Sequence, residues 1–171
     1  VYGFFGLMII VPWVRDTFRP YYGGNGLSLF SAALLLGIMI LPTIISISES
    51  AIRSVPDKYY QGALALGATH ERSVFRTVLP AAKSGIMAGI VLGIGRAFGE
   101  TMAVIMIAGN QAWIPDNMFQ GIRTLTANIV MEMGYAQDLH REALIATGVV
   151  LFVFILIINT LFSILKRREA K

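Results

Sequence analysis

Three long apolar runs constrain the fold of this chain more than any other feature. They occupy residues 27–47, 85–108 and 143–165. A helix needs about 20 consecutive apolar residues to cross the hydrocarbon core of a bilayer, and each run is long enough. Charged residues make up only 14% of the 171 residues, less than the surface of a soluble domain requires. The sequence therefore predicts an all-α membrane protein with three complete spans.

A shorter apolar stretch, residues 1–14, begins the chain. It is too short to cross a bilayer, and no Met precedes it, so we interpret it as the far end of a span that starts upstream. We expect the chain to be the C-terminal part of one longer transmembrane domain. Residues 15–26 contain Pro20 and three glycines, which predicts a turn-rich connector.

The polar stretch 54–80 separates the first two complete spans, and it predicts two short helices. Pro56 suits a first helical position, and Gly67 is placed to end that helix. Thr69 is placed to cap a second helix, which Pro80 would stop. Two interpretations remain open. The stretch is either an ordered loop that a partner binds or a solvated loop that only connects two spans.

The distribution of Lys and Arg predicts the orientation in the membrane. Loop 48–83 carries five basic residues and the C-terminal tail carries four, whereas connector 109–142 carries two beside four acidic residues. Basic loops stay on the cytoplasmic side, so loop 48–83 and the C-terminus are predicted to be cytoplasmic. Within the connector, 124–133 has the apolar spacing of a helix lying on or dipping into the membrane. The net charge of +4 thus reports topology and not affinity for nucleic acid.

The span 85–108 combines a glycine repeat with two charges. Gly85, Gly89, Gly93, Arg96 and Glu100 would all fall within roughly 80° of arc on one continuous helix. The glycines predict close packing against another helix. A charge at membrane depth costs about 2.5–3.5 kcal/mol, and such groups usually face a pathway. An arginine fork there suits an oxyanion, while an ion pair between the two charges remains the alternative.

Sequence motifs for catalysis are absent. The chain has no phosphate-binding G-x-x-x-x-G-K-[ST] loop, no H-E-x-x-H and no G-x-S-x-G. It also has no cysteine, which excludes disulfides and thiolate metal sites. We therefore expect no enzymatic activity, no catalytic or metal-binding residue and no cofactor. His70 and His140 are interpreted as solvated loop residues.

The polar loop resembles that of the permease subunits of ABC importers. Those permeases carry E-A-A, three residues, G, nine residues and then I-x-L-P. The matching positions here are Gln61, Gly62, Ala63, Gly67, Thr77, Val78, Leu79 and Pro80. Gln61 replaces the usual Glu and Thr77 the usual Ile. The segments VYGFFGL, GRAFGETMAVIMIAGN and RTLTANIVMEMG further resemble the PstC-type permeases of bacterial phosphate transport.

The resemblance implies a helical membrane bundle of the MetI-like type, with about two further spans upstream, in the bacterial inner membrane. It implies a second permease subunit, a dimer of ATP-binding subunits that receives the helix 61–66, and a periplasmic phosphate-binding protein. ATP hydrolysis would belong to the ATP-binding subunits. Arg96 would meet phosphate in transit, and Glu100 would orient it or release the anion. The alternatives are a permease for molybdate or sulfate, a non-transporting scaffold or sensor, and an intramembrane hydrolase.

Overall fold

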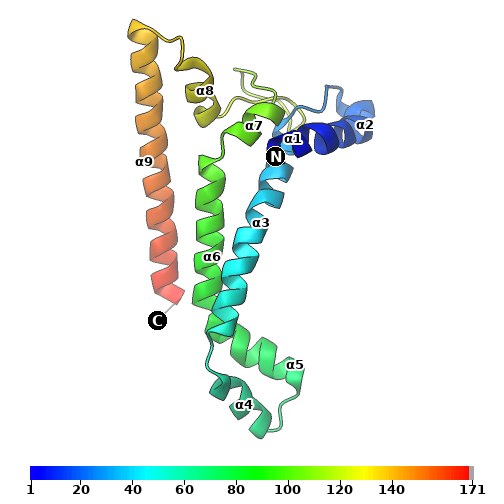
Figure 1. Cartoon of the computed structure of the whole chain (residues 1–171), viewed down its shortest axis with the longest axis vertical. Helices are drawn as coiled ribbons and strands as arrows, with labels where there is room; N and C mark the ends of the chain where they lie inside the picture. The colour runs from blue at the N-terminus through cyan, green and yellow to red at the C-terminus, as the bar shows by residue number, and fades with distance from the viewer. Residues whose placement is uncertain (170–171) are drawn as a thin grey trace. The chain divides into compact units, whose positions relative to one another are not determined.

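The computed structural model describes residues 1–169, and within them every regular element is a helix (Figure 1). Side chains from 165 onward, which include the basic tail, lie outside the described part. The elements are α1 (Tyr2–Phe5), the π-helical turn η1 (Gly6–Ile10), α2 (Val11–Tyr22), α3 (Leu29–Arg53), α4 (Asp57–Ala65), α5 (His70–Ser73), the π-helical turn η2 (Val74–Val78), α6 (Leu79–Gly99), α7 (Met102–Ile107), α8 (Leu125–Glu132) and α9 (Asp138–Glu169).

Three helical segments are long and apolar enough to cross a membrane. They are α3, the continuous helical stretch His70–Gly99 and the stretch Asp138–Ile164 of α9, with mean hydropathies of 2.3, 1.6 and 2.7. Only 17%, 17% and 6% of their most apolar windows are buried inside this chain, so most of their surface is free for lipid or other subunits. This arrangement confirms the predicted all-α membrane class.

The N-terminal helix extends further than the sequence suggested. We expected a connector over 15–26, but helix α2 continues through Tyr22 and the turn begins at Gly23. Pro20 lies in the last turn of α2, where it removes one backbone hydrogen bond but does not end the helix. The turn depends on Gly26, whose φ of +85° and contact with the Val11 carbonyl oxygen leave no room for a side chain.

The chain divides into two compact units, of which the first comprises residues 1–39 and 97–157. The first helix lies across the N-terminal end of α3 (Figure 1). The core contains side chains from η1–α2, the start of α3 and α7, namely Ile10, Val11, Val14, Ala32, Leu35, Ala103, Val104, Ile107 and Ala108. An aromatic cluster extends it, because Phe119 of the connector stacks on Phe18 at 4.7 Å and packs beside Phe30 at 5.4 Å between ring centroids.

The second unit comprises residues 40–96 and the chain from 158 onward. It contains the C-terminal half of α3, most of α6 and the polar loop that forms α4 and α5. Pro42 lies inside α3, where it removes one backbone hydrogen bond. The two predicted loop helices are present, although Pro56 precedes the first helical residue, Asp57, instead of occupying that position.

The predicted continuous helix over 85–108 is interrupted. Helix α6 ends at Gly99, Glu100 and Thr101 leave the helical path, and α7 begins at Met102. Two local hydrogen bonds favour this break, since Thr101 Oγ1 donates to the Gly99 carbonyl and the Ala103 N–H donates to Glu100 Oε1. Side-chain hydrogen bonds of this kind compete with those of a continuous helix.

Candidate functional site

The three glycines of the predicted stripe face α3. A Cβ at Gly85 would lie 2.5 Å from Cβ of Ala51, and one at Gly89 would lie 3.1 Å from Cβ of Ile47. Both distances are shorter than ordinary carbon–carbon contacts. The α6 backbone therefore approaches α3 as closely as helix packing allows, which is the usual use of small residues between membrane helices.

Arg96 lies in the last turn of α6, and its side chain is exposed. Its guanidinium has no hydrogen bond and no ion pair with any described side chain or backbone group of residues 1–164. An arginine left unpaired on an apolar helix needs an outside partner, because its charge is costly at membrane depth. The site thus presents a guanidinium that is accessible to an anion or to another subunit.

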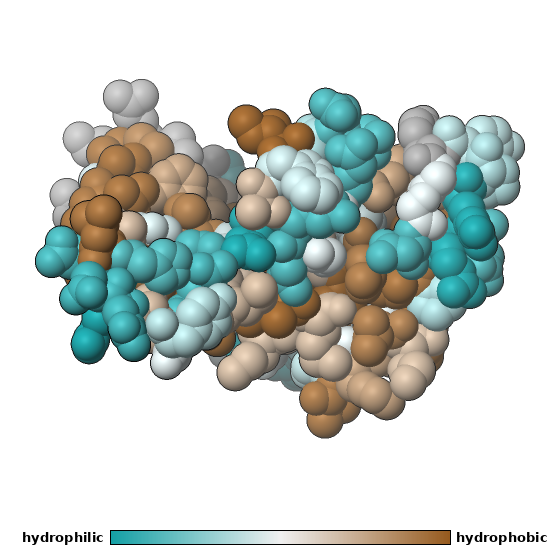
Figure 2. All heavy atoms as spheres, turned by 90° about the horizontal axis from the view of Figure 1, so that it is seen from above, coloured by the Kyte–Doolittle hydropathy of each residue, from teal (hydrophilic) through white to brown (hydrophobic). Residues whose placement is uncertain are grey.

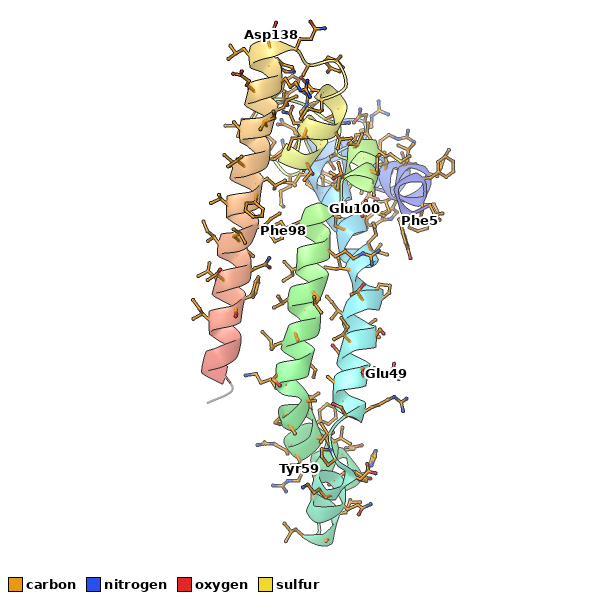
Figure 3. The ribbon with its side chains drawn as sticks, turned by 60° about the vertical axis from the view of Figure 1, so that its left-hand side comes forward. Phe5, Glu49, Tyr59, Phe98, Glu100 and Asp138 are labelled. Carbon is orange, nitrogen blue, oxygen red and sulfur yellow. The ribbon has the colours of Figure 1, made fainter. Side chains whose placement is uncertain are left out.

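Glu100 does not continue the helical face that carries Arg96, because α6 has already ended at Gly99 (Figure 3). Its half-buried side chain instead accepts a hydrogen bond from Ala103 N–H, 3.2 Å from Oε1. A carboxylate at this place also favours α7, since the start of a helix is electropositive. The sequence predicted Glu100 as a helix-face residue, and the structure places it in the break between two helices.

Glu100 borders a pocket of about 240 Å³ within the first unit. Phe98 lies beside it and faces α9, where its ring packs edge-on against Phe154 at 6.1 Å (Figure 3). Apart from Glu100, the polar residues that line the pocket are Thr124 and Thr126, at the start of α8. The remaining walls are apolar.

The polar loop in the second unit is an ordered pair of short helices. Tyr60 of α4 is hydrogen-bonded to His70 of α5, with 2.7 Å between the hydroxyl oxygen and Nδ1. Gly67 adopts a φ of +82° after the end of α4, and Thr69 Oγ1 accepts from Arg72 N–H to cap α5. His70 was predicted to be solvated, and it is exposed but also joins the two helices.

The tip of this loop presents the residues of the predicted docking motif. Gln61 and Gly62 are exposed, Ala63 is half-buried, and Leu66 leaves 91% of its surface accessible. Phe75 is 67% exposed, which is unusual for an aromatic ring in a polar loop. Leu79 and Pro80 lie further on, at the start of α6. Exposed apolar side chains on an ordered loop favour a protein-binding surface over a simple connector.

A charged cluster in the connector was not predicted. Arg123 Nη1 lies 2.6 Å from Glu132 Oε1, and His140 Nε2 lies 2.9 Å from the other oxygen of that carboxylate. Arg123 also donates to Asn128 Oδ1 and to the Asn110 carbonyl. The cluster ties the connector to α8 and to the first turn of α9. The i,i+4 spacing of Asn128 and Glu132 places both on one face of α8, but it does not predict that Arg123 folds back onto that face.

Figure 2 views the end of the molecule that carries this connector. Hydrophilic residues cover much of that face, and brown, hydrophobic residues lie among and around them. Trp113 and Ile114 of the connector are 63% and 92% exposed. An end of this composition is typical of a membrane protein where its helices meet water and the lipid headgroups.

Long apolar helices joined by ordered polar segments define a polytopic membrane protein. The chain belongs to the family described as "Binding-protein-dependent transport system inner membrane component", which it matches over residues 3–171. This match confirms the expected MetI-like membrane fold, and similarity to PstC proteins of several bacteria confirms the resemblance to PstC-type permeases.

Individual relatives are similar over nearly the whole chain. A probable ABC transporter permease, YqgH of Bacillus subtilis, is 40% identical over 95% of this chain and 54% of the relative. The phosphate transport system permease protein PstC of Pasteurella multocida is 32% identical over 100% of this chain and 58% of the relative. PstC of Mesorhizobium japonicum is 35% identical over 92% of this chain and 54% of the relative. The chain thus spans about half the length of these curated relatives, and no solved structure matches it.

Proposed function

We propose that this chain is part of the permease of an ATP-driven importer of inorganic phosphate in a bacterial inner membrane. The observation that carries the proposal is the similarity of nearly the whole chain to phosphate permeases. The unpaired guanidinium of Arg96 on an apolar helix adds a group suited to an oxyanion. A second permease subunit would complete the pathway, and a periplasmic phosphate-binding protein would deliver the ion.

The polar loop would couple the permease to ATP hydrolysis by a dimer of ATP-binding subunits. Its exposed tip, Gln61–Ala63 with Leu66, would enter a groove of an ATP-binding subunit on the cytoplasmic side. The loop connects directly to α3 and α6, and these helices touch at the glycines within the second unit. Closure of the ATP-binding subunits would therefore pull on a tightly packed helix pair and alter access to the pathway.

The orientation rests on charge. Five basic residues in loop 48–83 and a basic tail support a cytoplasmic loop and C-terminus, by the preference of Lys and Arg for that side. The connector 109–142, with its charged cluster, would then face the periplasm. Reactivity of single introduced cysteines at Leu66 and Ile114 toward an impermeant thiol reagent tests this topology, because only the periplasmic one should react in intact cells.

Uptake of labelled phosphate tests the function. The assay uses cells whose only high-affinity phosphate system contains the full-length permease, with Arg96 intact, Arg96→Lys or Arg96→Gln. We expect both variants to fail while the subunit still assembles, because a phosphate contact needs the bidentate arginine fork. Arg15→Gln is the matched control, since Arg15 is exposed and its ion pair is with the neighbouring Asp16.

The outcomes separate the remaining possibilities. Undiminished uptake by the Arg96 variants would contradict a role for Arg96 in the phosphate pathway, but it would not contradict phosphate import by the permease. No loss of phosphate uptake on deletion of the gene would contradict phosphate import. In that case, loss of molybdate or sulfate uptake on deletion identifies a permease for another oxyanion, and unchanged uptake of every oxyanion identifies a scaffold or sensor.

A further inference from the structure

The pocket of about 240 Å³ beside Glu100 contains three polar side chains within otherwise apolar walls. Glu100 supplies a carboxylate, and Thr124 and Thr126 supply hydroxyl groups. Leu36, Phe98, Leu151 and Phe154 are among the apolar neighbours. Polar groups that converge in an apolar pocket usually fix the orientation and identity of a ligand.

One oxygen of Glu100 is available to a ligand. Oε1 accepts from Ala103 N–H, whereas Oε2 has no hydrogen bond within the described chain. An ionised carboxylate only accepts hydrogen bonds, so it requires a ligand that donates one. In a pocket with apolar walls it also repels any anion that does not place a proton between the two charges.

The threonines are held in place by their surroundings. Thr124 Oγ1 accepts from Ala127 N–H and lies 3.1 Å from Thr126 Oγ1. The preceding residue, Arg123, is fixed by Glu132 and by the Asn110 carbonyl. Thr126 Oγ1 can therefore turn its proton toward the pocket without disturbing the helix cap, because a hydroxyl rotates freely and both donates and accepts.

We propose that this pocket recognises the protonated form of a tetrahedral oxyanion, with Glu100 accepting from its hydroxyl and Thr126 donating to one of its unprotonated oxygens. This inference rests on the proposed phosphate import and assigns Glu100 a role in specificity. At neutral pH, phosphate and arsenate each retain a hydroxyl, whereas sulfate has none. Sulfate would therefore place a bare negative oxygen against the carboxylate, and the pocket would reject it.

The test measures displacement of labelled phosphate from the permease subunits and ATP-binding subunits assembled in lipid nanodiscs without the periplasmic phosphate-binding protein, because that protein would itself bind phosphate. Unlabelled arsenate and sulfate are compared as competitors for the unmodified complex, Glu100→Gln and Thr126→Val. In the unmodified complex arsenate should compete and sulfate should not. With Glu100→Gln the preference for arsenate over sulfate should fall roughly ten- to hundredfold, the equivalent of one hydrogen bond to a charged group. Thr126→Val should weaken both phosphate and arsenate, by roughly two- to tenfold.

Matched controls and uptake measurements make each outcome decisive. Glu49→Gln removes a carboxylate that pairs with Arg53 on the surface of α3, and Thr147→Val removes a hydroxyl that donates to the Ala143 carbonyl within α9. Both should behave like the unmodified complex. If the Glu100→Gln importer still takes up phosphate and keeps its preference for arsenate over sulfate, this inference alone is overturned. The same holds if the importer takes up phosphate but the complex in nanodiscs shows no phosphate binding. A complex that neither binds nor imports phosphate would overturn the proposed function as well.

Discussion

Gly93 of α6 and Ile44 of α3 lie so close together that a Cβ at Gly93 would be 2.6 Å from Cγ1 of Ile44. No real carbon pair tolerates this separation, so any side chain at Gly93 would force the two helices apart or push Ile44 out of its rotamer. Gly85 and Gly89 continue the same contact toward the polar loop. The fit between α3 and α6 thus depends on the absence of side chains at three successive helical turns.

Substitution of Gly93 by Ala should therefore destabilise the permease by about 1–3 kcal/mol, the usual cost of overpacking. The matched control is Gly95→Ala on the same helix, because a Cβ at Gly95 meets no atom within 4 Å. Since alanine is the better helix former, that control should leave stability unchanged or raise it by up to about 1 kcal/mol. Thermal unfolding of the purified complex in detergent measures both. Equal melting temperatures for the two variants would contradict the close packing.

The glycine repeat was readable from the sequence because its four-residue spacing sets a helix face regardless of tertiary structure. The long helices and the loop helices were readable for the same reason, from apolar run lengths and from capping residues such as Gly67 and Thr69. These features depend on neighbours within one or two turns of the chain.

The break at Glu100 was not predicted, because the apolar run continues past it and hides two poor helix formers, Gly99 and Thr101, on either side. Only the hydrogen bonds from Ala103 N–H to Glu100 and from Thr101 to the Gly99 carbonyl reveal why the helix stops. The extension of α2 to Tyr22 was not predicted, because the glycines near the end of residues 15–26 were taken to exclude a helix from the whole segment. Pairing of Arg123 with Glu132 depends on how the connector folds back onto α8, which no local pattern encodes.

The Arg123–Glu132 pair leads to a second prediction. The two side chains are 24% and 19% exposed, so removal of the carboxylate leaves Arg123 poorly solvated and deprives His140 of its partner. Glu132→Gln should lower the stability of the permease by about 1–3 kcal/mol, the cost of leaving a largely buried polar group without its partner. Glu142→Gln, at an exposed position in the first turns of α9, should change it by less than about 0.5 kcal/mol.

Thermal unfolding again measures the difference, and hydrogen exchange locates it. Glu132→Gln should speed exchange of the α8 amides, whereas Glu142→Gln should not. If neither variant speeds exchange of the α8 amides and neither lowers the melting temperature, the cluster does not hold the connector on α8.

The Tyr60–His70 hydrogen bond supports a final prediction, about the polar loop. Tyr60→Phe keeps the ring, which packs edge-on against His70 at 5.7 Å, but removes the hydroxyl that joins α4 to α5. A net contribution of about 0.5–1.5 kcal/mol from one hydrogen bond corresponds to a roughly two- to tenfold loosening of the helix pair. Amides of α4 should exchange faster by that factor, and the ATP-binding subunits should bind the permease more weakly, because a less ordered loop loses more entropy on docking.

Tyr59→Phe is the matched control, since the Tyr59 ring is half-exposed and no described residue is hydrogen-bonded to its hydroxyl. Faster exchange with unchanged binding would confirm the hydrogen bond but remove the loop from the docking surface, while identical behaviour of the two variants would show that the bond does not order the loop.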